Sequence, residues 1–366
     1  MSGKQRHFFP GGNTSKGFYS FYRYILSQDE ARRIICIKGG PGTGKSSLMK
    51  KVAKIFLEKG YEVEQHHCSS DNNSLDGVVV KGLNIALLDG TAPHVVDPMN
   101  PGAVDEILNM GQCWNEEGFK DYRSLIMDTN KKVGKTFKRA YRFFAAAKDI
   151  YEDWYTFNSE ALSLNKINLL KEELKNEILT NNISRLGFDR HLFATAFTPN
   201  GIVTYINNLI EGFQKVYVLK GGPGTGKTKV LQYLYEEANR QGYYVEVFHT
   251  PLTPERIEHV LIPELGVAIV TSNEINNLNL EGKVYDMNNL LNQGLLEKNK
   301  ADIEDVKETF YMLLNKGLAC IKCAKTLHDE LETGFIPNMN FEKVNEVSEE
   351  IIQRLLKYEE EYLMNK

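Results

Sequence analysis

Two octapeptides, Gly39-Gly-Pro-Gly-Thr-Gly-Lys45-Ser46 and Gly221-Gly-Pro-Gly-Thr-Gly-Lys227-Thr228, decide the fold of this 366-residue chain. Both satisfy the pattern G-x-x-x-x-G-K-[ST], in which glycines let successive backbone amides point at phosphate oxygens. Each follows an apolar run typical of a buried strand and precedes a sequence with helical periodicity. A strand, a glycine loop and a helix in this order predict a loop that binds phosphate at a helix N-terminus.

The chain is an internal duplication. An offset of 182 residues aligns 33–46 with 215–228 without a gap, and the match continues from KGYEVEQHH onto QGYYVEVFH. This repeat predicts two modules, 1–183 and 184–366, with a boundary in the segment 181–184. The expected fold is α/β: two tandem P-loop NTPase modules with parallel sheets, each with a helical appendage, because unbroken apolar strands alternate with helices.

Each module is expected to hold the same elements. In the first they are a strand near Phe8, a helix from about Gly17, strands at 33–38, 61–66 and 83–88, and a helix at 45–59. In the second they are a strand near Phe193, a helix from about Gly201, strands at 215–220, 243–248 and 265–270, and a helix at 227–240. The segments 101–180 and 282–366 are rich in Glu, Lys and Leu and are predicted to be helical.

Every fixed position of the two glycine loops has a role in binding a nucleoside triphosphate. The lysine ammonium is expected to reach the β- and γ-phosphates, and the hydroxyl of Ser46 or Thr228 to ligate Mg²⁺. The residues expected to bind nucleotide are Gly39, Gly40, Pro41, Gly42, Thr43, Gly44, Lys45, Ser46 and Ser47 in the first module, and Gly221, Gly222, Pro223, Gly224, Thr225, Gly226, Lys227 and Thr228 in the second.

The two modules differ at the acid that such a site uses to hold Mg²⁺. In the first, the apolar strand ends at Asp89, which is the expected carboxylate. In the second, Thr271 occupies that place, and Glu274 lies three residues later at a spacing unsuited to the same role. We therefore expect hydrolysis in the first module, with Lys45 and Asp89 as catalytic residues, and a weak or inactive second site.

The residue that activates water is left open by the sequence. Gly90 follows Asp89 where many P-loop ATPases carry a glutamate, so His94 or Asp97 is the candidate, with a purely structural turn as the alternative. The segment 66–71 ends a strand at the edge where related folds bind a second substrate. His67 recurs as His249, which fits a repeated structural hydrogen bond or a shared role, and the His and Cys residues here lack zinc-ligand spacing.

Composition excludes several classes of protein. The formal net charge is −4 with a pI near 6.1, so no overall basic field favours nucleic acid. No stretch approaches the roughly 18 apolar residues of a membrane-spanning helix, and the first residues lack the apolar core of a secretory signal. A cytoplasmic protein without membrane partners is expected.

The two loops, the duplication and the segments RHFFPGGNTSKGF and DGTAPHVVDP resemble a bacterial family of tandem P-loop proteins, whose members are described as ATPases or nucleotide-kinase-like proteins inferred from sequence. The resemblance implies ATP and Mg²⁺ as ligands, with Lys45, Ser46 and Asp89 in the motif roles. The resemblance does not identify a second substrate. The choice of ATP over GTP rests on this resemblance and on the absence of a guanine-reading N-K-x-D sequence.

Three hypotheses follow. The first is an ATPase whose first module hydrolyses ATP and whose second holds nucleotide as a regulatory or structural element. The second is a small-molecule or nucleotide kinase with its acceptor near 66–71. The third is a non-catalytic nucleotide switch that presents its helices to a protein or nucleic-acid partner.

Overall fold

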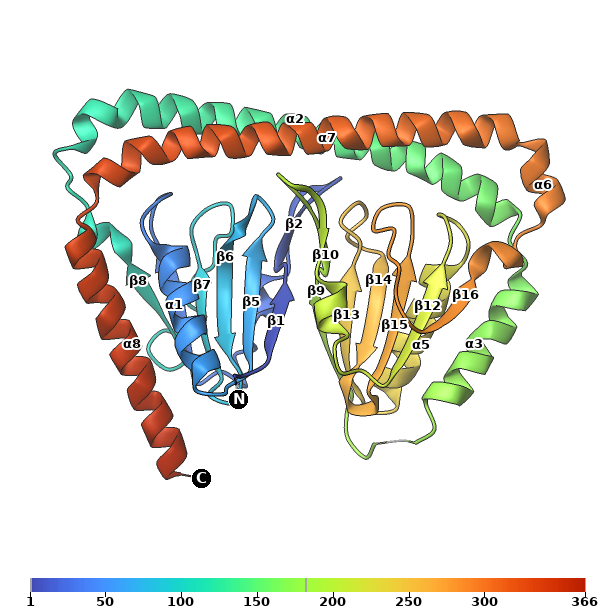
Figure 1. Cartoon of the computed structure of the whole chain (residues 1–366), viewed down its shortest axis with the longest axis horizontal. Helices are drawn as coiled ribbons and strands as arrows, with labels where there is room; N and C mark the ends of the chain where they lie inside the picture. The colour runs from blue at the N-terminus through green and yellow to red at the C-terminus, as the bar shows by residue number, and fades with distance from the viewer. Residues whose placement is uncertain (1, 182, 366) are drawn as a thin grey trace. The chain divides into compact units, whose positions relative to one another are not determined.

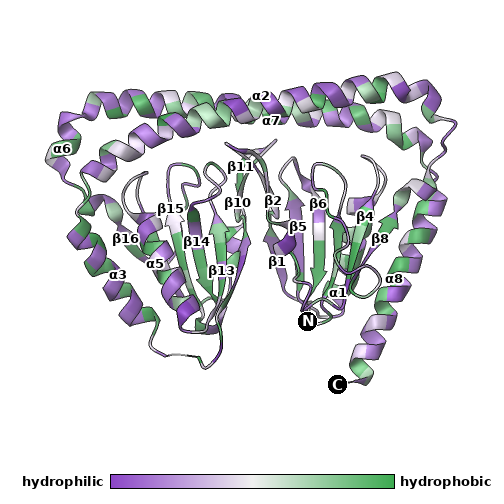
Figure 2. Cartoon of the chain, turned by 180° about the vertical axis from the view of Figure 1, so that it is seen from behind, coloured by the Kyte–Doolittle hydropathy of each residue, from purple (hydrophilic) through white to green (hydrophobic). Residues whose placement is uncertain are grey.

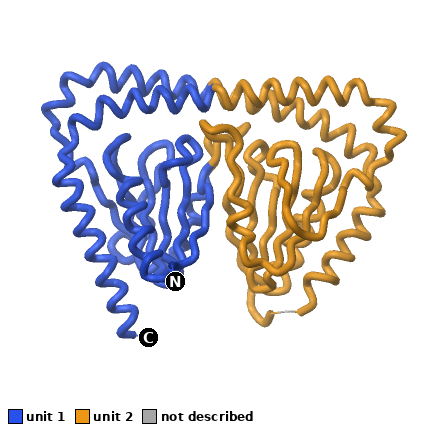
Figure 3. The backbone as a smooth tube through the Cα atoms, in the orientation of Figure 1, with its two compact units in different colours: residues 1–11, 20–138, 320–366 blue, residues 12–19, 139–319 orange. Residues whose placement is uncertain are grey.

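The computed structural model describes residues 2–181 and 183–365, so Asn182, beside the predicted boundary between 183 and 184, lies outside the described residues. The chain forms two compact units. Unit 1 comprises residues 1–11, 20–138 and 320–366, and unit 2 comprises residues 12–19 and 139–319 (Figure 3). Each unit thus contains residues from both sequence modules, because the long helices of each module end in the other unit.

Each unit contains one six-stranded sheet, and the two sheets share one topology (Figure 1). The strands of unit 1, in sheet order, are β1 (Gln5–Phe8), β5 (Val63–Cys68), β6 (Asp71–Val80), β7 (Ile85–Asp89), β4 (Arg33–Lys38) and β8 (Asp105–Asn109). Those of unit 2 are β9 (Phe188–Leu192), β13 (Tyr244–His249), β14 (Ile257–Ile262), β15 (Val267–Ser272), β12 (Lys215–Lys220) and β16 (Lys283–Asp286). The α/β class and the two similar halves are therefore confirmed.

The prediction of all-parallel sheets is wrong, because β6 and β14 run antiparallel to both of their neighbours. Only residues 69–70 connect β5 to β6, and so short a connection permits a hairpin but not a parallel crossover. β8 and β16 are further strands within the segments predicted to be helical. Both sheets are consequently mixed, with three parallel pairings among the five.

The helices predicted from Gly17 and Gly201 are also absent from the described residues, which form β-hairpins there. The pairs are β2 (Gly11–Thr14) with β3 (Gly17–Ser20), and β10 (Thr195–Thr198) with β11 (Gly201–Thr204). Gly17 and Gly201 have φ values of 95° and 91°, which only glycine adopts without strain. A threonine hydroxyl donates to each glycine carbonyl, at 2.8 Å and 3.0 Å, and closes the turn.

One face of each sheet is covered by two helices from different sequence modules. In unit 1 these are α1 (Lys45–Glu58) and α8 (Phe341–Met364), and in unit 2 they are α5 (Lys227–Arg240) and α3 (Leu164–Ile178). Helix α8 contributes five buried apolar side chains to the core of unit 1: Val344, Val347, Ile351, Ile352 and Leu355. At about 1.5–3 kcal/mol for each fully buried side chain, this helix is integral to the unit.

The remaining helices connect these elements. They are η1 (Tyr22–Tyr24), η2 (Met110–Cys113), α2 (Phe119–Glu160), α4 (Ile206–Leu209), η3 (Pro263–Leu265), η4 (Met287–Leu290), α6 (Gln293–Lys298), α7 (Lys300–Phe335) and η5 (Ile336–Asn338). Hydrophilic and hydrophobic residues alternate along α2 and α7 (Figure 2). Among the described residues, no helix combines the length and apolar character that crossing a bilayer requires.

Candidate functional site

The first glycine loop connects β4 to α1 in unit 1. Gly42 and Gly44 adopt positive φ values of 66° and 91°, so the backbone turns sharply before the helix. Thr43 is buried, and its hydroxyl donates to the Gly40 carbonyl at 2.8 Å. Gly44 is the N-cap of α1 and supplies no side-chain acceptor, so the first amides of this helix lack a side-chain cap. Such amides are a suitable binding site for an anion.

The structure brings Lys45 and Asp89 together. The Lys45 ammonium donates to the Gly39 and Gly40 carbonyls at 2.8 Å and 2.7 Å, and its Nζ lies 3.6 Å from Asp89 Oδ2. The other Asp89 oxygen accepts the Thr91 amide at 2.9 Å, which fixes the carboxylate at the end of β7. Both side chains are at least 85% buried, so their charges interact with little screening by water.

The two serines that follow Lys45 differ in environment. Ser46 is partly buried, and its hydroxyl accepts the Leu75 amide of β6 at 3.0 Å. Ser47 is exposed on α1. The groups around this loop fit a divalent cation held together with a phosphate. The Ser46 hydroxyl and the Asp89 carboxylate suit the cation, and the uncapped helix amides suit the phosphate.

The candidate water-activating residues lie in two different environments. His94 is buried, with its Nε2 3.6 Å from Asp76 Oδ2 and its ring stacked on Tyr22 at a centroid distance of 5.2 Å. Asp97 is 70% exposed and forms an ion pair of 2.9 Å with Lys38, which also donates to the Gly90 and Val96 carbonyls. His94 therefore faces a buried carboxylate, whereas Asp97 anchors the surface loop after β7.

The second glycine loop, between β12 and α5 in unit 2, repeats this backbone. Gly224 and Gly226 have φ values of 72° and 90°, and the Lys227 ammonium donates to the Gly221 and Gly222 carbonyls at 2.5 Å each. Lys227 is more deeply buried than Lys45. Burial lowers the pKa of Lys227, and the negative charge of Glu274 offsets only part of this shift. The Glu274 carboxylate accepts a hydrogen bond from the Tyr151 hydroxyl of α2.

A carboxylate near this loop was missed by the sequence analysis. Glu258 on β14 lines a small cavity of about 50 Å³ together with Lys227, Thr228 and Thr271. It is 2% exposed, accepts a hydrogen bond from Asn276 Nδ2 at 2.9 Å, and burial raises its pKa to about 7. The same 182-residue offset aligns Glu258 with Asp76 on β6, and burial raises the pKa of Asp76 too. This alignment is the signal that predicts a repeated buried acid.

His67 and His249 form equivalent hydrogen bonds in the two units. The Nε2 of His67 lies 2.8 Å from His7 Nδ1, and the Nε2 of His249 lies 2.8 Å from His191 Nδ1. Burial lowers the pKa of His67 to about 4 and that of His249 to about 3. The repetition matches the structural-bond interpretation, in which a histidine pair joins each edge strand to its neighbour.

Each glycine loop lies against a helical segment from the other sequence module. In unit 2, Asn158 of α2 donates to the Pro223 carbonyl at 2.6 Å. In unit 1, Phe335 packs on Gly40 and Ile336 packs on Gly42. A Cβ added at Gly40 would lie 2.4 Å from the Phe335 ring, and one added at Gly42 would lie 2.8 Å from the Ile336 side chain. Each loop is therefore held in contact with a helical segment, α2 in unit 2 and the end of α7 with η5 in unit 1.

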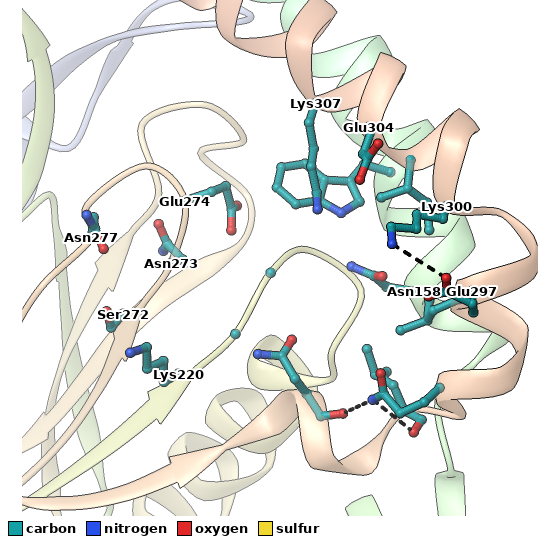
Figure 4. Close-up of a pocket in the computed structure, with 18 of the residues that line it drawn as sticks. Asn158, Lys220, Ser272, Asn273, Glu274, Asn277, Glu297, Lys300, Glu304 and Lys307 are labelled. Atoms are coloured by element: carbon teal, nitrogen blue, oxygen red, sulfur yellow. Dashed lines mark hydrogen bonds and ion pairs between the residues drawn. The ribbon is translucent and has the colours of Figure 1, made fainter.

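A larger cavity of about 810 Å³ lies beside the second loop (Figure 4). Trp154 and Asn158 of α2, the residues after β15, and the α6–α7 region contribute to its wall. Its charged residues are Lys220, Lys300, Lys307, Glu274, Glu297 and Glu304. A cavity lined by an aromatic ring, by equal numbers of lysines and glutamates and by several side-chain amides suits a small polar molecule.

Comparisons of the chain with protein-family models, with curated proteins and with solved structures give no match.

Proposed function

We propose that unit 1 binds a nucleoside triphosphate, ATP by the sequence resemblance, at Gly39–Ser46 and hydrolyses it with Mg²⁺, whereas unit 2 binds nucleotide at Gly221–Thr228 as a regulatory or structural element. The observation that carries this proposal is the approach of Lys45 to Asp89 beside an uncapped helix N-terminus. A backbone cradle, a cation and a metal-binding acid are the parts that phosphoryl transfer requires.

The residues of unit 1 divide the chemistry among them. Lys45 leaves the Gly39 and Gly40 carbonyls and neutralises charge on the β- and γ-phosphates. The amides of Gly42 to Lys45 bind the same oxygens, and they are already oriented before nucleotide arrives. The Ser46 hydroxyl and the Asp89 carboxylate would hold Mg²⁺, which would supply further neutralisation of charge on the transferring phosphoryl group.

The asymmetry between the units gives the test. Phosphate release by the full chain with ATP and Mg²⁺ is measured for Lys45→Ala and Lys227→Ala, alongside equilibrium binding of a fluorescent ATP analogue. We expect Lys45→Ala to reduce turnover at least about 100-fold, and Lys227→Ala to change it by a few-fold while removing one bound nucleotide. Equal losses of turnover would contradict the asymmetry, and no nucleotide retained by the wild type would contradict the proposal itself.

A second candidate function, transfer of phosphate to a small molecule, is favoured by the cavity of about 810 Å³ beside the second loop. Its volume lies within the usual range for sites of drug-sized ligands. A panel of metabolites incubated with ATP and Mg²⁺ distinguishes the two functions. Faster transfer to one acceptor than to water would select the kinase.

A further inference from the structure

Unit 1 also contains a group of buried side chains that could act as metal ligands. Cys68 at the end of β5, Asp76 on β6 and His94 after β7 each offer one ligand atom, and these atoms all lie within 4.8 Å of one another. The three residues are 8%, 3% and 8% exposed. Their positions in the sequence do not match the ligand spacing of a zinc motif, which is why the sequence alone did not predict this group.

Several features of this cluster point to a bound ion. Asp76 Oδ2 and the Tyr22 hydroxyl are both buried, and neither makes a hydrogen bond of normal geometry among the described residues. The polar groups that face Asp76 are the Tyr22 hydroxyl, the Cys68 thiol and the His94 ring. A buried carboxylate oxygen without a partner is costly, so such groups are usually paired or coordinated to metal. His94 Nε2 already lies 3.6 Å from that oxygen, which is a normal separation for two ligands of one tetrahedral ion.

Unit 2 provides an internal comparison. The residues aligned with Cys68, Asp76 and His94 are Thr250, Glu258 and Asn276. There the acid is retained: Asn276 Nδ2 hydrogen-bonds Glu258 Oε1 at 2.9 Å, while Glu258 Oε2 is buried without a hydrogen bond of normal geometry among the described residues. Threonine and asparagine are poor ligands for zinc, whereas thiolate and imidazole are its preferred ones. The two units therefore differ in the side chains around the acid: unit 1 has the thiol and the imidazole, and unit 2 has a hydroxyl and an amide.

We propose that Cys68, Asp76 and His94 bind one zinc ion in unit 1. Three protein ligands leave a fourth position for water or for the nearby Tyr22 hydroxyl. The cross-strand register pairs Gly77 with Leu88, so the site lies beside Asp89 and the first glycine loop. The proposal does not depend on the nucleotide function, because Lys45, Ser46 and Asp89 are not among these ligands; of the residues considered for the nucleotide site it uses only His94.

The test uses Co²⁺ as a spectroscopic probe for zinc. The full chain is stripped with a chelator and titrated with Co²⁺, and we expect a thiolate-to-cobalt absorption band that saturates at one ion per chain. A Cys68→Thr/His94→Asn variant gives unit 1 the residues of unit 2. This variant should lose the band and bind Co²⁺ more than about 100-fold more weakly.

The control removes two thiols outside this cluster, Cys320 and Cys323 of α7, as a Cys320→Ser/Cys323→Ser variant. This variant should keep the band, and a Lys45→Ala variant should keep it as well even if nucleotide binding is lost. A band that persists in the Cys68→Thr/His94→Asn variant, or that disappears with Cys320 and Cys323, would overturn the proposal.

A second measurement needs no substitution. X-ray absorption at the zinc edge of the reloaded wild type should show one sulfur at about 2.3 Å and nitrogen or oxygen ligands at about 2.0–2.2 Å. Two sulfurs, or none, would exclude this ligand set even if the variants fail to fold.

Discussion

The two glycine-loop sites share a backbone but not a set of charges. In both, glycines with positive φ precede a helix, and the lysine folds back onto two carbonyls of its own loop. Around the first loop, Asp89 on β7 approaches the lysine; around the second, Thr271 replaces it and Glu258 on β14 lines the cavity. Duplication therefore preserved the cradle, which glycine geometry fixes, and the buried acid at Asp76 and Glu258, whereas the acid at the end of β7 has no counterpart at Thr271.

The largest effect is expected at Asp89. Replacing it by Asn keeps the shape but removes the charge that faces Lys45 and would hold Mg²⁺, so phosphate release should fall by about 10²–10³-fold. The matched change in unit 2, Thr271→Asn, alters no charge and should leave turnover within a few-fold. Steady-state phosphate release with ATP and Mg²⁺ measures both. Turnover by Asp89→Asn at more than a third of the wild-type rate would show that the two sites do not differ in this way.

The sequence predicted the strands and helices next to each glycine loop closely. The helix predicted at 227–240 occupies those residues, and the strand predicted at 33–38 does as well. These elements are specified locally, by apolar runs and by glycines at positions that require them. The approach of Lys45 to Asp89 follows from the same local pattern, because parallel neighbouring strands end at one edge.

Two features could not be predicted in this way. Strand β6 begins with Asp71-Asn-Asn-Ser, which is typical of a turn, so its pairing with β5 and β7 and the position of Asp76 stayed hidden. Helices α3 and α8 have clear apolar faces, but periodicity does not say which sheet such a face will cover. Each helix packs in the unit built mainly from the other sequence module.

The next largest effect is expected where the helix contact of unit 2 is tightest. A Cβ at Gly224 would lie 2.2 Å from the Tyr155 carbonyl oxygen, whereas at Gly42 it would meet the flexible Ile336 side chain at 2.8 Å. Gly224→Ala should therefore lower the free energy of unfolding of unit 2 by roughly 3 kcal/mol, from strain and overpacking together. Gly42→Ala should cost unit 1 less, because a side chain moves aside more easily than backbone.

The control for this prediction is Gly212→Ala. Gly212 also has a positive φ, of 87°, but a Cβ there would meet nothing within 4 Å, so it isolates backbone strain. Urea unfolding of unit 2 is followed by Trp154 fluorescence in a Trp114→Phe background. A Gly224→Ala variant no less stable than Gly212→Ala would mean that α2 does not contact the loop as described.

The smallest effect concerns the acid that sequence analysis missed. Burial, with a smaller contribution from the charge of Glu274, raises the Glu258 pKa from 4.5 to about 7, and Lys227 and Arg256 line the same cavity. His259 Nε2 lies 3.5 Å from Glu258, but burial lowers its pKa to about 3, so this ring is neutral. The native state therefore holds a proton that the unfolded chain releases, and the stability of unit 2 should decline as pH rises from about 4.5 through 7.

Glu258→Gln removes this titration. Between pH 5 and pH 8, the wild type should lose roughly 2–3 kcal/mol of unfolding free energy relative to the variant. The exposed Glu281→Gln serves as the matched control and should follow the wild type. Parallel stability profiles of wild type and Glu258→Gln across this range would mean that Glu258 is already ionised at pH 5. The second site would then carry a permanent negative charge beside Lys227, as the first does through Asp89, and the electrostatic difference between the two units would disappear.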